Sequence, residues 1–127
     1  MSGHKALVVD DSRAVRTILT RALRGFGYEA DEAEDGLQAL QILEGCPARY
    51  QLALVDWNMP VMNGLELIRR LRARPEFAAL LIVMVTTETE MSHVGAALEA
   101  GANEYVMKPF TTEVLFSKLE IVGGILS

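Results

Sequence analysis

The sequence predicts an α/β protein built on a doubly wound parallel sheet, with helices covering both faces of the sheet. Three observations predict this class. Short apolar runs alternate five times with amphipathic segments, the connections between them are short, and most of the runs are apolar throughout. Continuous apolar runs indicate strands that are buried on both faces, and strand–helix alternation is typical of parallel sheets. We therefore expect a three-layer (βα)5 sandwich.

The composition favours one domain and argues against several classes of partner. The chain has 127 residues, of which 50% are hydrophobic, so residues 1–127 can bury the core of a single domain. A formal net charge of −5 argues against nucleic-acid and anionic-membrane partners. The one cysteine, Cys46, cannot form an internal disulfide. The apolar stretch before Asp10 is too short for a signal peptide or a membrane span, so a cytoplasmic location is expected.

The first half of the chain contains three expected strands and two expected helices. Ser12 is a favoured residue at a helix start and Gly27 at a helix end, so a helix is predicted between them. The pair Asp35-Gly36 opens the second helix, which closes near Gly45. The second strand is the weakest of the three, because half of its positions are polar. The expected strands are 6–9, 28–33 and 51–55.

The second half continues the same alternation. Asn63-Gly64 starts the third helix, Val94 lies in the fourth, and Thr112 begins the fifth. The strand at 80–85 is the most apolar segment of the chain, and the strand at 105–107 is brief. Apolar residues at helical spacing indicate the buried faces of the helices. For the second, third and fourth helices these residues are Leu37, Leu40 and Leu43; Leu65, Ile68 and Leu71; and Val94, Ala97 and Leu98.

The composition of the strands also predicts their order in the sheet. The first, third and fourth strands are nearly pure apolar and belong at the centre, whereas the half-polar second strand and the short fifth strand belong at the edges. With right-handed crossovers, this arrangement permits the order 2-1-3-4-5. Ligands bind such sheets beyond the carboxyl ends of the strands, where the direction of winding reverses. That point lies between the first and third strands.

Polar residues follow the strands at this edge of the predicted sheet. Asp10, Asp11 and Asp56 leave the first and third strands, and three adjacent carboxylates repel one another unless a cation joins them. Oxygen ligands of this kind suit Mg²⁺. Thr86 at the end of the fourth strand supplies a hydroxyl, and Lys108 after the fifth strand supplies an ammonium group. Together these residues predict a magnesium-dependent phosphoryl-binding site.

Each of these residues also has an interpretation that needs no ligand. Asp11 could cap the first helix, because aspartate is a favoured N-cap residue. Asp56 could be an ordinary turn residue, Thr86 alone is uninformative, and Lys108 could be a solvated surface lysine. The meeting of all five polar residues at one edge of one sheet is what favours a site.

The motifs match a known family. The chain resembles a response-regulator receiver domain, which has a flavodoxin-like fold, and within that family it is most similar to single-domain chemotaxis regulators. Each motif alone is weak, but together they run in the right order from one end of the chain to the other. The matching stretches are Leu7-Val8-Val9-Asp10-Asp11-Ser12, Ala33-Glu34-Asp35-Gly36, Asp56-Trp57-Asn58-Met59-Pro60, Met62-Asn63-Gly64-Leu65-Glu66-Leu67, Met84-Val85-Thr86, and Gly101-Ala102 through Tyr105-Val106-Met107-Lys108-Pro109-Phe110.

The resemblance implies a phosphoryl acceptor and a metal site. Asp56 would accept a phosphoryl group from the phosphohistidine of a histidine kinase. Asp10, Asp11 and Asp56 would hold one Mg²⁺ ion together with the backbone carbonyl of Asn58. Phosphorylation would add roughly 1.5 to 2 negative charges at the acceptor.

The resemblance further implies a switch. Thr86 would hydrogen-bond to the phosphoryl group, Lys108 would pair with it, and the Lys108-Pro109 bond is expected to be cis. Movement of Thr86 would let Tyr105 change from an exposed to a buried rotamer. This would alter the face formed by the fourth helix, fifth strand and fifth helix, which would bind an output protein such as the flagellar motor switch. Tyr105 could also be an edge-strand aromatic residue that only covers the fifth helix.

Three further positions bear on the lifetime of the signal and on access to the site. In the family, the positions of Asn58 and Glu88 tune the rate at which the acyl phosphate hydrolyses. Thr87 departs from the pattern, because the family usually has a smaller alanine or glycine there. We therefore expect Thr87 to narrow access for a phosphodonor or a phosphatase.

Two alternatives remain open at this point. The first is a Mg²⁺-dependent phosphatase or phosphotransferase with an aspartyl nucleophile. Such enzymes usually place an Asp-x-Asp pattern after the first strand, whereas here the acids of Asp10-Asp11 are adjacent. The second alternative stays within the family: the chain is a receiver fragment of a longer regulator, or a stand-alone regulator of an output other than flagella.

Overall fold

The computed structural model describes residues 4–87 and 92–123, in which five strands and five helices alternate. All five strands pair in parallel in the order β2-β1-β3-β4-β5, which confirms the predicted fold class and strand order. Short 3₁₀ turns, η1 (Pro47–Arg49) and η2 (Pro75–Phe77), precede β3 and β4. The strands are β1 (Lys5–Val9), β2 (Glu29–Ala33), β3 (Leu52–Asp56), β4 (Leu81–Thr87) and β5 (Glu104–Lys108). The helices are α1 (Arg13–Gly25), α2 (Gly36–Gly45), α3 (Gly64–Arg72), α4 (Val94–Ala100) and α5 (Thr112–Gly123).

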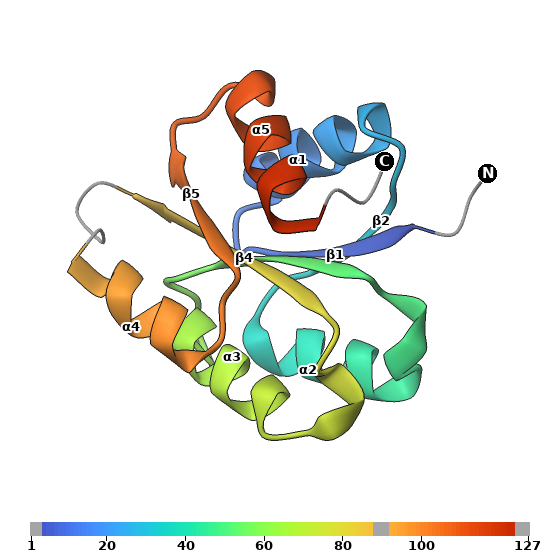
Figure 1. The fold of residues 1–127 in the computed structure, drawn as a ribbon, viewed down its shortest axis with the longest axis vertical. Coiled ribbons are helices and arrows are strands. Elements are labelled where there is room, and N and C mark those ends of the chain that lie inside the picture. The colour runs from blue at the N-terminus through green and yellow to red at the C-terminus, as the bar shows by residue number, and fades with distance from the viewer. Residues whose placement is uncertain (1–3, 88–91, 124–127) are drawn as a thin grey trace.

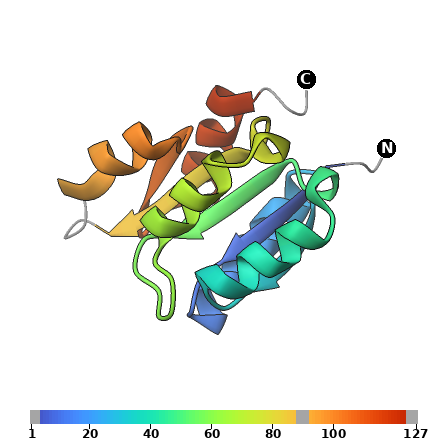
Figure 2. The same cartoon turned by 90° about the horizontal axis from the view of Figure 1, so that it is seen from below.

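Helices cover both faces of the sheet, and each strand sends alternate side chains to the two faces. Helices α1 and α5 lie on one face, and α2, α3 and α4 lie on the other (Figure 1). The turned view shows α2 and α3 side by side across the sheet (Figure 2). In β1, Leu7 and Val9 join the apolar core under α2 and α3, while Ala6 and Val8 join the core under α1 and α5. Within the described part of the chain, no helix is long and apolar enough to span a bilayer.

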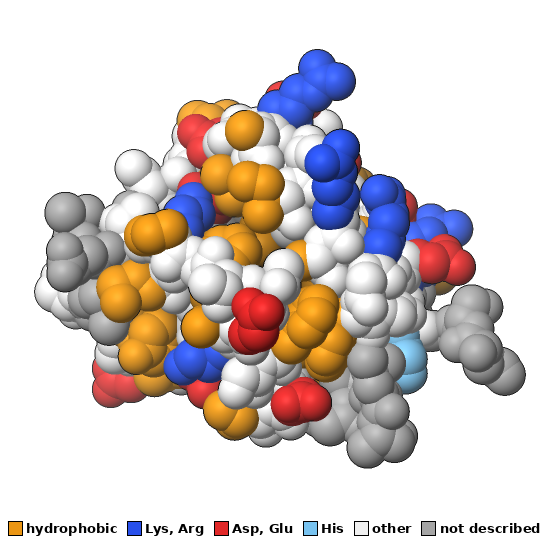
Figure 3. Space-filling view, turned by 90° about the horizontal axis from the view of Figure 1, so that it is seen from above, with side chains coloured by type: hydrophobic (Ala, Val, Ile, Leu, Met, Phe, Trp, Pro, Cys, Tyr) orange, Lys and Arg blue, Asp and Glu red, His pale blue; other side chains and the backbone are white. Residues whose placement is uncertain are grey.

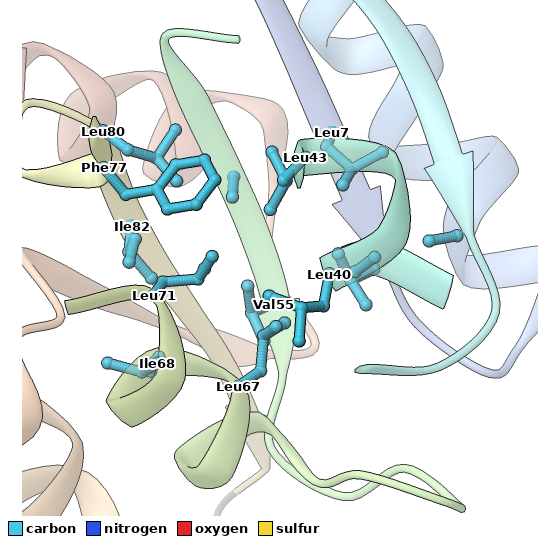
Figure 4. Close-up of a cluster of buried hydrophobic side chains, with 14 of the residues drawn as sticks. Leu7, Leu40, Leu43, Val55, Leu67, Ile68, Leu71, Phe77, Leu80 and Ile82 are labelled. Atoms are coloured by element: carbon cyan, nitrogen blue, oxygen red, sulfur yellow. The ribbon is translucent and has the colours of Figure 1, made fainter. Parts of the chain in front are cut away.

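The core between the sheet and α2, α3 and α4 contains the larger buried side chains (Figure 4). Phe77, in the turn η2, is 1% exposed and closes one end of this core. Apolar cores cover both faces of the sheet, so a polar functional site is expected at the ends of the strands. The labelled members are Leu7, Leu40, Leu43, Val55, Leu67, Ile68, Leu71, Phe77, Leu80 and Ile82.

Side-chain caps fix the starts of the first three helices at the carboxyl edge of the sheet. Ser12, Asp35 and Asn63 each accept a hydrogen bond from the backbone N–H three residues later, at 2.8 to 3.3 Å. Ser12, rather than Asp11, is therefore the N-cap of α1. At the other end of α1, Gly27 adopts a φ of 100°, which confirms it as the residue that ends this segment.

Each predicted buried face of α2, α3 and α4 contains at least one residue that is not buried, whereas Leu40, Leu43, Ile68, Leu71 and Ala97 are buried as predicted. Leu37 in α2 and Leu98 in α4 are both 41% exposed. The buried stripe of α2 runs through Gly36, Ala39, Leu40 and Leu43, following the helical repeat of 3.6 residues, and Leu37 lies about 100° away from it. In α4 the buried residue is Ala97, and in α3 the stripe includes Leu67 in place of Leu65.

Candidate functional site

The carboxyl ends of four neighbouring strands bring the predicted polar residues together. Asp10 follows β1, Asp56 ends β3, Thr86 lies near the end of β4, and Lys108 ends β5. The parallel registers place these strand ends at one edge, with Val9 opposite Val55 and Thr87 opposite Lys108. The first three side chains lie within the protein: Asp10 and Thr86 are each 1% exposed, and Asp56 is 5% exposed.

The lysine ammonium group lies between the two buried carboxylates. Lys108 Nζ is 3.1 Å from Asp10 Oδ2 and 3.3 Å from Asp56 Oδ1. Burial alone would lower the pKa of Lys108, but the negative charges of Asp56 and Asp10 outweigh burial and raise the pKa. The lysine therefore stays charged across the physiological pH range. The peptide bond between Lys108 and Pro109 is cis, as the resemblance implied.

A third carboxylate completes an acidic cluster at this edge. Oxygen atoms of Asp10, Asp11 and Asp56 lie within 4.8 Å of one another, and Asp11 is exposed. Three carboxylates and one ammonium leave a net negative charge, and the donor set consists of hard oxygen ligands. This combination fits a small divalent cation such as Mg²⁺. Asp11 is free of a capping role in α1, since Ser12 provides that cap.

A buried arginine that was not among the predicted site residues contacts the main chain of Asp10. Arg16 is 8% exposed, and its guanidinium donates to the carbonyl oxygen of Asp10 at 2.7 Å and to Glu32 Oε1 at 2.9 Å. The backbone N–H of Ser12 donates to Asp10 Oδ1 at 2.8 Å. These contacts orient Asp10. A signal was present in the sequence, because Arg16 shares the buried stripe of α1 with Leu19 and faces the sheet.

The remaining predicted residues lie around the rim of the site. Asn58 is exposed in the loop after β3, and Thr87 is half-buried at the end of β4. Glu88 lies outside the described residues. The Thr86 hydroxyl is 3.4 Å from the carbonyl oxygen of Thr87. Tyr105 in β5 is half-buried, packs against the core, and has Lys118 Nζ 4.3 Å from the centre of its ring.

The loop between β3 and α3 approaches the carboxyl end of β3 very closely. Val61 has a φ of 68°, which is unusual for a β-branched residue, and the N–H of Met62 donates to the carbonyl of Pro60 at 2.7 Å. The N–H of Gly64 donates to the carbonyl of Trp57 at 2.9 Å. A methyl group on Gly64 would lie 2.4 Å from the carbonyl oxygen of Asp56, so only glycine fits there without movement.

A sheet edge that gathers an acidic cluster, a buried hydroxyl and a lysine on this topology defines a receiver-type site. The family model of the response regulator receiver domain matches residues 6–120 of the chain. The protein therefore belongs to the response regulator receiver domain family.

The curated proteins that it resembles include chemotaxis regulators. The chain is 46% identical to the chemotaxis protein CheY1 of Helicobacter pylori over 121 residues, which cover 94% of this chain and 97% of that protein. It is 45% identical to the chemotaxis protein CheY homolog of Campylobacter jejuni over 121 residues, which cover 94% of this chain and 92% of that protein.

Solved structures of the family superpose closely on this fold. Chemotaxis response regulator CheY4 of Vibrio cholerae has a TM-score of 0.87 at 34% identity, covering 95% of this chain and 99% of that one. The receiver domain of a sensor histidine kinase from Pseudomonas aeruginosa has a TM-score of 0.85 at 30% identity, covering 97% and 99% of the two chains. That second structure has a magnesium ion coordinated in its active site cleft.

Proposed function

We propose that this protein is a chemotaxis response regulator that accepts a phosphoryl group on Asp56 from a histidine kinase. The observation that carries the proposal is the position of Lys108 Nζ, which lies within 3.3 Å of both buried carboxylates. A lysine held in this position can pair with the oxygens of a phosphoryl group on Asp56. A lysine with a purely structural role would need only one carboxylate partner, so the second carboxylate favours a site that binds a ligand.

The proposed transfer is a substitution at phosphorus. A carboxylate oxygen of Asp56 forms a P–O bond as the P–N bond of the donor's phosphohistidine breaks. The imidazole leaves with the bonding electron pair and takes up a proton. Lys108 and the hydroxyl of Thr86 stabilise the phosphoryl oxygens. A Mg²⁺ ion held by Asp10, Asp11, Asp56 and the carbonyl of Asn58 would neutralise charge on the transferring group.

An apolar pocket next to the site offers a place for the phosphodonor. It has a volume of about 410 Å³ and is lined by Val15 and Ile18 of α1 and by Thr87, Lys108, Pro109 and Phe110. Figure 3 looks onto the face covered by α1 and α5 and shows hydrophobic side chains gathered there. We propose that the kinase, or a phosphatase, docks here, and that Thr87 on the pocket wall narrows its approach.

The proposed output surface is the α4–β5–α5 face. β5 is an edge strand, flanked by α4 on one face of the sheet and α5 on the other (Figure 1). Tyr105 lies in this strand, and Lys118 of α5 covers its ring. Phosphorylation would draw Thr86 toward Asp56, and Tyr105 would then move into the space that Thr86 leaves. An output partner, such as the flagellar motor switch, would bind the rearranged face.

A small phosphodonor such as acetyl phosphate tests the acceptor directly. With Mg²⁺, we expect intact-mass spectrometry to detect one phosphoryl group per chain, and peptide mapping to locate it at Asp56. Asp56→Asn should abolish the labelling. Asp31→Asn is the matched control, since Asp31 lies in β2 and pairs with Lys5 instead of Lys108. Labelling that persists in Asp56→Asn would overturn the proposal.

The same experiment separates the signalling function from an enzyme. Receiver domains are signalling proteins rather than conventional enzymes, so the label should be stoichiometric. Repeated turnover of the donor without a covalent label would favour the phosphatase alternative. Affinity capture with and without beryllofluoride, a phosphoryl analogue, would distinguish a flagellar partner from another output. The cytoplasmic location, the assignment of residues 1–127 to one receiver domain, and a role of Asn58 and Glu88 in phosphate lifetime stay predictions.

A further inference from the structure

The start of α4 is held differently from the starts of the other helices. Helices α1, α2 and α3 have side-chain caps, and Thr111 Oγ1 accepts a hydrogen bond from the N–H of Val114 at the start of α5. Among the described residues, no side chain caps α4, whose N-cap position is occupied by His93. Instead, the imidazole of His93 stacks on the indole of Trp57, with ring centroids 4.8 Å apart and planes inclined by 9°.

The indole in this stack belongs to the residue next to the proposed acceptor. Trp57 directly follows Asp56, and its N–H donates to the carbonyl oxygen of Val85 in β4 at 3.2 Å. Its carbonyl oxygen accepts from the N–H of Gly64 at the start of α3. The main chain of Trp57 is thus fixed on both sides, while its ring reaches the residue just before α4. The stack therefore joins the residue after Asp56 to the residue before α4.

We propose that His93 is a positioning residue, and that its stack on Trp57 couples the state of Asp56 to the start of α4. This inference rests on the proposed function of Asp56. It adds a route that is separate from the movement of Thr86 and Tyr105, because it runs from the residue after β3 to the start of α4 and does not involve β5. The route requires a planar ring at position 93, and the imidazole charge is not essential to it.

Three variants separate stacking from other effects of the side chain. His93→Ala removes the ring, whereas His93→Phe keeps a planar ring and removes the ring nitrogens. His4→Ala is the matched control, because His4 is the other histidine of the chain and also contacts an aromatic ring. Its partner is Tyr28, with ring centroids 5.7 Å apart, at the amino end of the sheet.

The test measures amide hydrogen exchange in α4 with and without Mg²⁺ and beryllofluoride. In the wild type, beryllofluoride should change the exchange rates of residues 94–100 by about three- to tenfold, the range expected from an aromatic pair. The change should disappear in His93→Ala and persist in His93→Phe and His4→Ala. Without beryllofluoride, acrylamide should quench Trp57 fluorescence about twofold more strongly in His93→Ala, because loss of the stacked ring exposes the indole.

Direct measurement of beryllofluoride uptake by ¹⁹F NMR separates the two levels of the proposal. Absence of uptake by the wild type would contradict the proposed function, and with it this route. Normal uptake with the same α4 response in the wild type and His93→Ala would overturn the role of His93 alone. An α4 response that is lost in both His93→Ala and His93→Phe would overturn stacking as the means of coupling.

Discussion

The two edges of the sheet surround a partly buried cation with different kinds of partner. At the amino edge, the guanidinium of Arg72, at the end of α3, is surrounded by neutral acceptors at 2.7 to 3.0 Å. At the carboxyl edge, the ammonium group of Lys108 pairs with the carboxylates of Asp10 and Asp56, and Asp11 adds a third carboxylate to the same cluster. The acceptors of Arg72 are the carbonyl oxygens of Phe77, Leu80 and Gly101 and the side-chain oxygen of Asn103.

The pKa values of Arg72 and Lys108 shift in opposite directions, which reflects the difference between their partners. Burial lowers the pKa of Arg72, and none of these four acceptors carries a compensating negative charge. The pKa of Lys108 is raised, because the carboxylates of Asp56 and Asp10 outweigh its burial. Arg72 therefore joins η2 to the segments that precede β4 and β5, and its hydrogen-bond donors are satisfied without a ligand. The carboxyl edge has an excess of negative charge, which a divalent cation can neutralise.

The largest expected effect concerns the amino edge. Arg72→Met should lower the free energy of unfolding by about 3 kcal/mol, because several loop carbonyls lose their donor. Arg72→Lys should lie between this variant and the wild type, since an ammonium cannot donate as a planar fork. Chemical denaturation measures the effect. Arg70→Met is the matched control: among the described residues Arg70 pairs with exposed Glu66 alone, and its loss should cost about 0.5 kcal/mol or less.

The second prediction concerns Mg²⁺ at the carboxyl edge. A cation that binds only the folded chain should raise the free energy of unfolding by about 2.7 kcal/mol at a concentration of one hundred times its Kd. Mg²⁺ should raise the free energy of unfolding of Arg72→Met by the same amount, because Arg72 lies at the amino edge and the cation binds at the carboxyl edge. An equal gain with Mg²⁺ in a variant that lacks the acidic cluster would show that the cation acts elsewhere.

The third prediction separates metal binding from folding within the carboxyl edge. Asp11→Asn should weaken Mg²⁺ binding by at least about tenfold, which corresponds to about 1.4 kcal/mol, because one of three anionic ligands is lost. Because Asp11 is exposed and Ser12 caps α1, stability without metal should change by less than about 0.5 kcal/mol. Titration of Trp57 fluorescence with Mg²⁺ measures the affinity. A large loss of stability of Asp11→Asn in the absence of metal would contradict this prediction.

The smallest expected effect tests a charged contact at the amino edge. The hydroxyl of Tyr50 donates to Asp31 Oδ2 at 2.6 Å, and Lys5 Nζ lies 3.3 Å from the same oxygen. Burial alone would raise the pKa of Asp31, but these two partners outweigh it and lower the pKa. This carboxylate therefore stabilises the folded state fully above the pKa that Asp31 has in the unfolded chain, about 3.9. The stabilisation is lost as the pH falls through the lower pKa of Asp31 in the folded protein.

Tyr50→Phe should remove part of this contribution. We expect a loss of about 0.5 to 1 kcal/mol at pH 7, the usual size of a single hydrogen bond at a partly exposed site. The difference from the wild type should shrink in strongly acidic solution, where Asp31 is protonated in both proteins. Denaturation at several pH values measures it, and a difference that grows as the pH falls would contradict the proposed contact.

The sequence predicted the carboxyl edge better than the amino edge for a physical reason. Asp56, Thr86 and Lys108 follow apolar runs, and the ends of parallel strands must meet at one edge. Arg72 gave no such signal, because most of its closest acceptors are backbone carbonyls, which carry no residue identity. The stack of His93 on Trp57 was also missed, since it joins two loops whose approach depends on tertiary packing.

The close contact between Gly64 and the carbonyl of Asp56 bears on how this protein can change during evolution. Any side chain at position 64 would collide with the main chain of the proposed acceptor, where no flexible group can move aside. Lys118 and Val114 on α5, by contrast, can be replaced without touching the acceptor. New partners can therefore be acquired by substitutions on the outer helices. The loop that holds the acceptor can tolerate few changes, and signalling chemistry and partner choice can thus diverge at different rates.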